Sequence, residues 1–144
     1  MEKSQKKMIY IDANIFIFAF ADNSENGEFS RKILEMIETK KIAAATSSLT
    51  IDEVLWALRK EIPQNEAIRA CKTILKIKGL KILRVDKTTI FESLDIVSSF
   101  NLKPRDAIHV ATMNLEGIKE IISEDLDFDK LKDIKRFSIL KFIQ

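Results

Sequence analysis

Residues 8–20 have the sequence MIYIDANIFIFAF, in which a short apolar run ends at Asp12 and Asn14 before apolar residues resume. A run such as 8–11 is typical of a strand buried on both faces of a parallel sheet. The apolar residues after Asn14 continue for about two helical turns, which predicts a helix. We therefore expect Asp12 at the point where a strand ends and a helix begins. In open α/β sheets this end of a strand is where ligands bind.

Further strands and helices alternate along the rest of the chain. Short apolar runs predict strands at 42–46, 80–85 and 120–123, and a last strand at 137–143. Helical spacing of apolar residues predicts helices over 29–37, 51–58, 67–75, 90–97 and 104–115. The fourth of these helices is predicted from the spacing of Ile90, Leu94 and Val97. The alternation predicts an α/β fold, a three-layer α/β/α sandwich with a mainly parallel central sheet.

Length and composition favour a single domain over residues 1–144, since no linker, repeat or low-complexity tract divides the chain. The net charge is only +2, so bulk charge by itself does not indicate a nucleic-acid binder. A lone cysteine, Cys71, excludes an internal disulfide and fits a reducing compartment, which favours a cytoplasmic protein. Its helical spacing to Ile74 predicts a position in the core.

The N-terminus has some features of a signal peptide. Lys3, Lys6 and Lys7 precede an apolar stretch, as in a secretory leader. However, Asp12 and Asn14 interrupt that stretch, and removing it would delete the best strand. We therefore expect these residues to belong to the folded domain. No stretch is long and apolar enough to span a membrane.

Acidic residues recur at the expected edge of the sheet. Asp12 and Asp125 follow strands, whereas Glu53 and Asp106 lie near the starts of helices that would begin at the same edge. Each acid alone has a simpler explanation. Asp12 suits a helix N-cap, Glu53 suits a capping box that starts at Thr50, and Asp106 suits the first turn of a helix. Asp125 and Asp127 also suit a turn.

Four acids gathered at one edge would need a cation. Two carboxylates about 4 Å apart repel by roughly 4 kcal/mol at an effective dielectric near 20. Oxygen ligands favour Mg²⁺ or Mn²⁺, and a single histidine and a single cysteine make a zinc cage implausible. A calcium loop at 125–136 is excluded because Lys130 and Arg136 replace its required Gly and Glu. A hard cation held by acids suits the activation of water against a phosphodiester.

These residues resemble the PIN-domain family. The resemblance rests on Ile11-Asp12-Ala13-Asn14, on Ser48 with Glu53, on PRDAIHVA at 104–111 and on SEDLDFD at 123–129. The order and spacing of these segments cover nearly the whole chain. The single-domain length is similar to that of the VapC-type toxins and their archaeal relatives.

The resemblance implies a Mg²⁺- or Mn²⁺-dependent endoribonuclease, a hydrolase of RNA phosphodiester bonds. It also implies the toxin of a VapBC-type pair, often a homodimer, that a cognate antitoxin protein holds in check. By matched position, the catalytic metal-binding acids would be Asp12, Glu53, Asp106 and Asp125. Asn14 and Ser48 would orient these acids through hydrogen bonds, and Asp127 would join or support them. His109 matches a position on the body of a helix, where we expect a packed or surface side chain.

Some features leave alternatives open. Asp52 stands beside Glu53, so either could be the acid of that helix, and Glu124 stands where many relatives have a basic or neutral residue. The chain could be a PIN-domain RNA-processing nuclease without an antitoxin. It could also be a scaffold that binds RNA or protein without cutting, although the presence of all four acids argues against this. A phosphatase-like enzyme with Asp12 as nucleophile would have a second acid where Asn14 stands.

Basic and aromatic residues give weaker signals. Candidate contacts to RNA phosphates, each expected to be a solvated surface charge, are Arg59, Lys60, Lys103, Arg105, Lys130, Lys132, Lys135 and Arg136. The segment 15–20 and the region around Trp56 are hydrophobic enough to pack against a second subunit. Burial in the core is the expected fate of most of these side chains.

Overall fold

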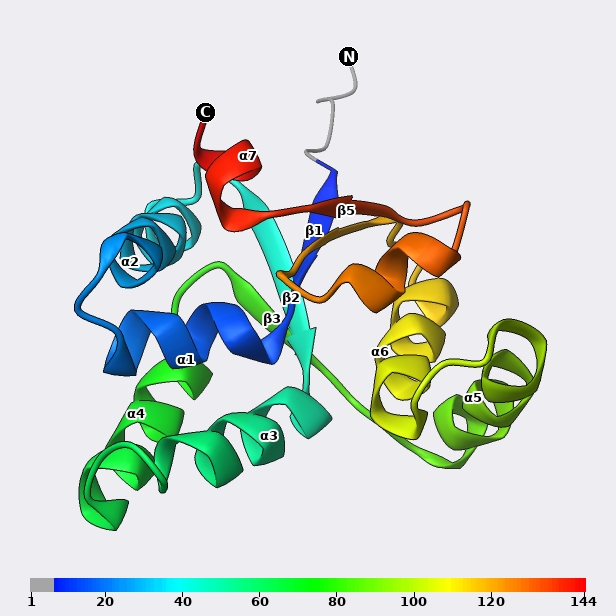
Figure 1. The fold of residues 1–144 in the computed structure, drawn as a ribbon, viewed down its shortest axis with the longest axis horizontal. Coiled ribbons are helices and arrows are strands. Elements are labelled where there is room, and N and C mark those ends of the chain that lie inside the picture. Colours follow the sequence, from blue (N-terminus) through cyan, green and yellow to red (C-terminus); the bar gives the residue numbers. More distant parts are fainter. Residues whose placement is uncertain (1–6) are drawn as a thin grey trace.

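The computed structural model describes residues 7–144, in which the strands form one parallel sheet (Figure 1). Its strand order is β3-β2-β1-β4-β5, and every neighbouring pair is parallel. The strands are β1 (Met8–Ile11), β2 (Ala43–Ser47), β3 (Leu80–Leu83), β4 (Glu120–Ile122) and β5 (Lys135–Phe137). Lys3 and Lys6 of the signal-like segment lie outside the described residues.

Helices cover both faces of this sheet, so the predicted three-layer sandwich is confirmed (Figure 1). One face carries α1 (Ala13–Ala21), α2 (Glu25–Glu38), α3 (Ser48–Leu58), α4 (Gln64–Leu75) and α7 (Ile139–Ile143). The other carries α5 (Lys87–Phe100), α6 (Pro104–Leu115) and the 3₁₀-helix η1 (Leu126–Lys130). Successive side chains of β1 point to opposite faces of the sheet. Ile9 and Ile11 therefore pack in the core under α1 and α3, and Tyr10 packs in the core under α6.

The C-terminal segment differs from the prediction of a strand over 137–143. Strand β5 ends at Phe137, and the chain turns into α7. Ser138 caps this helix by accepting a hydrogen bond from the backbone N–H of Lys141 at 3.2 Å. Ile139 is then buried in the core on the α2 side of the sheet. A serine cap ahead of apolar residues therefore outweighed the strand signal of that run.

Helix α5 lies where it was predicted, but of the three apolar residues that predicted it, Val97 packs against the core whereas Ile90 and Leu94 are exposed. Thr89, Ser93 and Ile96 are its buried residues, whereas Leu94 is 62% exposed. The N-cap Asp86 forms a capping box with Thr89, and this box sets where the helix starts. Thr89 faces inward. Leu94, five positions later, therefore lies on the outer side of the helix, and Ile90 is exposed as well.

Two other expectations have opposite outcomes. Cys71 is buried in the core, as predicted, and burial raises the pKa of its thiol. Trp56 is 54% exposed, so the expectation of core burial is wrong for this residue. The cationic groups of Arg59 and Lys60 lie over its ring, at 5.4 and 4.9 Å from the centroid, which gives an exposed aromatic ring local partners. Among residues 7–144, no helix has the length and apolarity needed to cross a membrane.

Candidate active site

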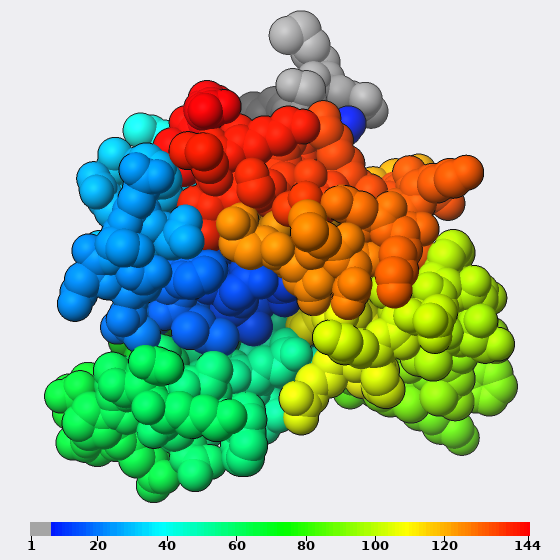
Figure 2. Space-filling view, viewed as in Figure 1, coloured from blue at the N-terminus to red at the C-terminus, as the bar shows by residue number. Residues whose placement is uncertain are grey.

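The carboxyl ends of β1 and β4 bring two of the predicted acids together. These strands pair in parallel with Ile11 opposite Ile122, and the backbone N–H of Asp12 donates to the carbonyl of Ile122 at 3.1 Å. Asp12 follows β1 directly, and Asp125 lies three residues beyond the end of β4. In Figure 2 the blue, cyan-green, yellow and orange parts of the chain meet near the middle of the visible face.

Two compact groups of possible ligands occupy this edge. In each group the three side chains offer ligand atoms that all lie within 4.8 Å of one another. The inner triad consists of Asp12, Glu53 and His109, and the outer triad consists of Asp106, Asp125 and Asp127. A single pocket is lined by residues of both triads, namely Glu53, Asp106 and Asp125, together with Lys103, Pro104 and Arg105.

Asp12 is buried at the base of the site and is held by several donors. Its Oδ1 accepts a hydrogen bond from the backbone N–H of Ala13 at 2.8 Å, so Asp12 does cap α1. Its Oδ2 accepts from the Ser123 hydroxyl at 2.5 Å and from the Asn14 amide at 3.3 Å. Burial raises the pKa of this carboxyl, although His109 and the bonds from Ser123 and Ala13 act against that rise. Asp12 is thus both the N-cap of α1 and a member of the acid cluster.

Ser123 connects the two strand-end acids. It belongs to the segment 123–129 that carries the family resemblance, but no role was predicted for it. Its hydroxyl donates to Asp12 and accepts from the backbone N–H of Asp125 at 3.0 Å. The Asn14 amide also reaches this hydroxyl, at 3.4 Å. Asn14 therefore does contact an acid, as predicted, while the usable signal for Ser123 was its position directly after β4.

Glu53 does not belong to a capping box. The N-cap of α3 is Ser47, whose hydroxyl accepts from the backbone N–H of Thr50 at 3.4 Å, so Glu53 lies in the second turn. Its Oε1 lies 2.6 Å from Nε2 of His109, whereas the neighbouring Asp52 is exposed. The structure thus places Glu53, and not Asp52, beside the other acids.

Ser48 was predicted to orient the acids and is instead exposed at the start of α3. Within residues 7–144, no hydrogen bond joins its side chain to one of the acids. The buried serine at this junction is its neighbour Ser47, because β2 extends one residue farther than the strand predicted at 42–46.

Asp106 carries the clearest sign of a missing partner. It lies in the first turn of α6, as predicted, and its Oδ2 is buried without a hydrogen-bond partner among the described residues. Burial, together with the negative charges of Asp125 and Asp12, raises its pKa to about 7. Asp125 is better satisfied, because its Oδ1 caps η1 by accepting from the backbone N–H of Asp127 at 2.9 Å. A carboxylate-rich set of oxygens with an unpartnered, buried oxygen fits a hard divalent cation.

His109 is the residue that sequence reasoning most underestimated. It is fully buried, as a packed histidine would be, but both ring nitrogens are engaged at the acid site. Nε2 contacts Glu53 at 2.6 Å and lies 3.9 Å from Oδ1 of Asp12, while Nδ1 lies 2.6 Å from the Tyr10 hydroxyl oxygen. The available signals were spacings: His109 is one helical turn after Asp106, and Tyr10 is two residues before Asp12 on a strand.

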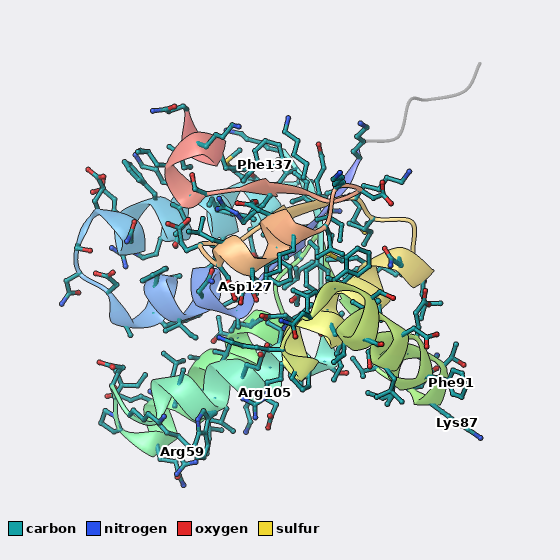
Figure 3. All side chains as sticks on the ribbon, turned by 45° about the vertical axis from the view of Figure 1, so that its right-hand side comes forward. Arg59, Lys87, Phe91, Arg105, Asp127 and Phe137 are labelled. Carbon is teal, nitrogen blue, oxygen red and sulfur yellow. The ribbon has the colours of Figure 1, made fainter. Side chains whose placement is uncertain are left out.

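The predicted basic residues differ in their surroundings. Lys103 and Arg105 line the acid pocket, and Figure 3 shows Arg105 at the start of α6 on the side where Asp127 lies. Arg136 instead has a structural role. It donates to both carboxylate oxygens of Asp129, at 3.0 and 3.2 Å, and to the carbonyl of Ser123 at 2.9 Å.

Glu124 also has a structural contact. Its carboxylate accepts a hydrogen bond from the backbone N–H of Ile139 at 2.7 Å, at the start of α7. The acid that departs from the pattern of many relatives therefore joins the loop after β4 to the C-terminal helix.

Comparison with known proteins agrees with this geometry. Residues 9–134 match the sequence profile of the family described as PIN domain. The chain is 27% identical to ribonuclease VapC2 of Methanocaldococcus jannaschii, over 99% of this chain and 97% of that protein. Among solved structures, VapBC2 of Rickettsia felis bound to a promoter DNA fragment has a TM-score of 0.71 at 13% identity, covering 91% of this chain and 98% of that one. A toxin–antitoxin complex from Klebsiella pneumoniae has a TM-score of 0.63 at 22% identity, covering 88% and 94%.

Proposed function

This chain belongs to the PIN-domain family, and from that premise we propose that it is a metal-dependent endoribonuclease that hydrolyses RNA phosphodiester bonds. The observation that carries the proposal is one pocket lined by acids of both triads, in which Oδ2 of Asp106 is buried and has no hydrogen-bond partner among the described residues. The ribonuclease name of the archaeal relative supports the substrate class.

The metal would be Mg²⁺ or Mn²⁺, because the donors are carboxylate oxygens. Its ligands would come from Asp12, Glu53, Asp106, Asp125 and Asp127. When bound, such a cation supplies an activated water and stabilises the developing negative charge on the leaving oxygen. The chain's own residues prepare for it, since Ser123 and Asn14 hold Asp12 in one orientation.

The substrate would approach along the open side of the pocket. Lys103 and Arg105 line the pocket beside Glu53 and Asp106, where a cationic side chain can pair with an RNA phosphate. Such contacts position the strand without reading its sequence. We therefore assign these two residues to the grip on RNA. Lys130, whose Nζ lies 3.9 Å from Oδ1 of Asp127, is instead paired with an acid of the outer triad.

The biological setting we propose is that of a VapC-type toxin: a cytoplasmic homodimer with one nuclease domain over residues 1–144, inhibited by a cognate antitoxin. The toxin–antitoxin complexes among the structural neighbours support this setting. The second candidate is an RNA-processing nuclease without an antitoxin. An adjacent reading frame for a small DNA-binding protein would favour the first candidate, and its absence would favour the second.

Cleavage of a structured RNA by the purified protein tests the activity. We expect cleavage with Mn²⁺ or Mg²⁺, none with EDTA, and a fall on the order of 10²–10³-fold for Asp106→Asn. The matched control is Asp95→Asn, an exposed acid on α5, which should cleave like the wild type. Undiminished cleavage by Asp106→Asn would contradict the assigned site. A folded, metal-loaded protein that cuts none of a panel of RNAs would favour a binding scaffold instead.

A further inference from the structure

A buried chain of hydrogen bonds runs under the acid pocket. It starts at the Tyr10 hydroxyl on β1, passes through the ring of His109 on α6, and ends at the Glu53 carboxylate on α3. Both contacts measure 2.6 Å, and the His109 and Tyr10 rings also pack edge to face with centroids 5.5 Å apart. The Tyr10 and His109 side chains are shielded from solvent, while Glu53 reaches the pocket.

The bond from His109 links the two sides of the molecule. Helix α3 packs in the core on one face of the sheet, and α6 packs in the core on the other face (Figure 1). Glu53 comes from α3, whereas Asp106 and His109 come from α6. The bond between His109 and Glu53 thus fixes where the acid of one layer stands relative to the acids of the other.

The direction of this bond does not depend on the charge of the ring. A neutral ring that accepts the Tyr10 hydroxyl proton at Nδ1 carries its own proton on Nε2, and a charged ring carries protons on both nitrogens. In either form the Nε2 proton is directed to Glu53, 2.6 Å away. A carboxylate that receives such a bond keeps one orientation, whereas a free glutamate side chain samples many rotamers.

We propose that His109 is a positioning residue, anchored by Tyr10, which orients the Glu53 carboxylate for metal binding without contacting the metal itself. This role rests on the proposed metal-dependent function. In many metal sites a residue that does not touch the metal holds a ligand in place through a hydrogen bond. His109 would do this for Glu53. The engagement of both ring nitrogens argues against His109 as a direct ligand.

Two substitutions at the same position separate hydrogen bonding from packing. His109→Gln places an amide donor near the position of Nε2, and His109→Met fills the space with no donor. We expect His109→Met to weaken Mn²⁺ binding, measured by calorimetry, by about 10-fold or more, and His109→Gln to retain most of the affinity. Tyr10→Phe, which removes only the hydroxyl, should produce a smaller loss with little effect on folding. Thermal unfolding in EDTA checks that each variant is folded.

A double-substitution cycle tests whether His109 acts through Glu53. In a Glu53→Gln background, His109→Met should change Mn²⁺ affinity far less than it does in the wild type. Equal effects in the two backgrounds, or equal affinities of His109→Met and His109→Gln, would overturn the positioning role. Nitrogen coupling from a directly bound imidazole in pulsed EPR of the Mn²⁺-loaded wild type would also overturn it. A wild-type protein that binds no Mn²⁺ would instead overturn the proposed function, and this role with it.

Discussion

The inner and outer triads differ in how completely the protein itself satisfies them. Asp12 and Glu53 of the inner triad accept short hydrogen bonds from Ser123, Ala13 and His109. In the outer triad Asp106 has a buried oxygen without a partner within the described chain, and its pKa is raised to about 7. The inner triad is therefore organised before any cation arrives, whereas the outer triad retains electrostatic repulsion that a cation would relieve.

This contrast predicts opposite effects on activity and stability for Asp106→Asn. We expect metal-dependent RNA cleavage to fall by on the order of 10²–10³-fold, the scale for losing one preorganised electrostatic group. The metal-free variant should nevertheless melt higher than the wild type, because a buried negative charge beside Asp125 is gone. Asp106 is only partly buried, so the gain should be modest, roughly 2–4 °C by thermal unfolding in EDTA. A lower melting temperature for Asp106→Asn would contradict the contrast.

Asp12 should behave in the opposite way, because it also caps α1. Asp12→Ala removes the acceptor for Ala13 and Ser123 and should lower the free energy of unfolding by about 1–2 kcal/mol. Asp12→Asn keeps an oxygen that can cap the helix and is the matched control. Both variants should lose Mn²⁺ affinity, but only Asp12→Ala should lose this much stability in chemical denaturation. Equal stabilities of the two variants would show that the cap contributes nothing.

The pH dependence of the metal-free protein sharpens the comparison further. Because the pKa of Asp106 is about 7 in the folded protein, against an ordinary value of 3.8 for an aspartate, the folded state binds its proton more tightly than the unfolded state does. The stability that the folded protein gains by binding this proton is complete below about pH 4 and is lost as the pH rises through 7. The advantage of Asp106→Asn over the wild type should thus be present at pH 8 and absent near pH 4. Melting curves in EDTA across this range check it, and an advantage independent of pH would contradict the assigned cause.

Local patterns were sufficient to predict most of the fold and the acids. The run 8–11 followed by Asp12, and Pro104 before Asp106, combine strand or helix signals with a chemical group at one end. Parallel pairing then brings those ends together, as it does for Asp12 and Asp125. Their roles as metal ligands stay predictions that the proposed substitutions test.

What the sequence could not reveal depends on contacts between distant residues. Glu53 and His109 are 56 residues apart, and their bond requires the register of two helices on opposite faces of the sheet. The buried face of α5 likewise follows from the cap at Asp86, which outweighs the apolar spacing of Ile90 and Leu94. At 137–143 the apolar residues suited a strand and a helix equally, and Ser138 determined the outcome.

The junction of β2 and α3 gives the smallest predicted effect and tests the inner triad at its helix. Ser47 is buried and caps α3, whereas the neighbouring Ser48 is exposed, so the two serines form a matched pair. Ser47→Ala should lower the free energy of unfolding by about 1 kcal/mol, and it should weaken Mn²⁺ binding slightly because Glu53 is carried on the same helix. Ser48→Ala should change stability by less than about 0.5 kcal/mol and leave Mn²⁺ affinity unchanged. If Ser48→Ala loses Mn²⁺ affinity and Ser47→Ala does not, the orienting role that the family resemblance implied for Ser48 would be restored. Ser48 would then hydrogen-bond to an acid of the inner triad only when the metal is bound.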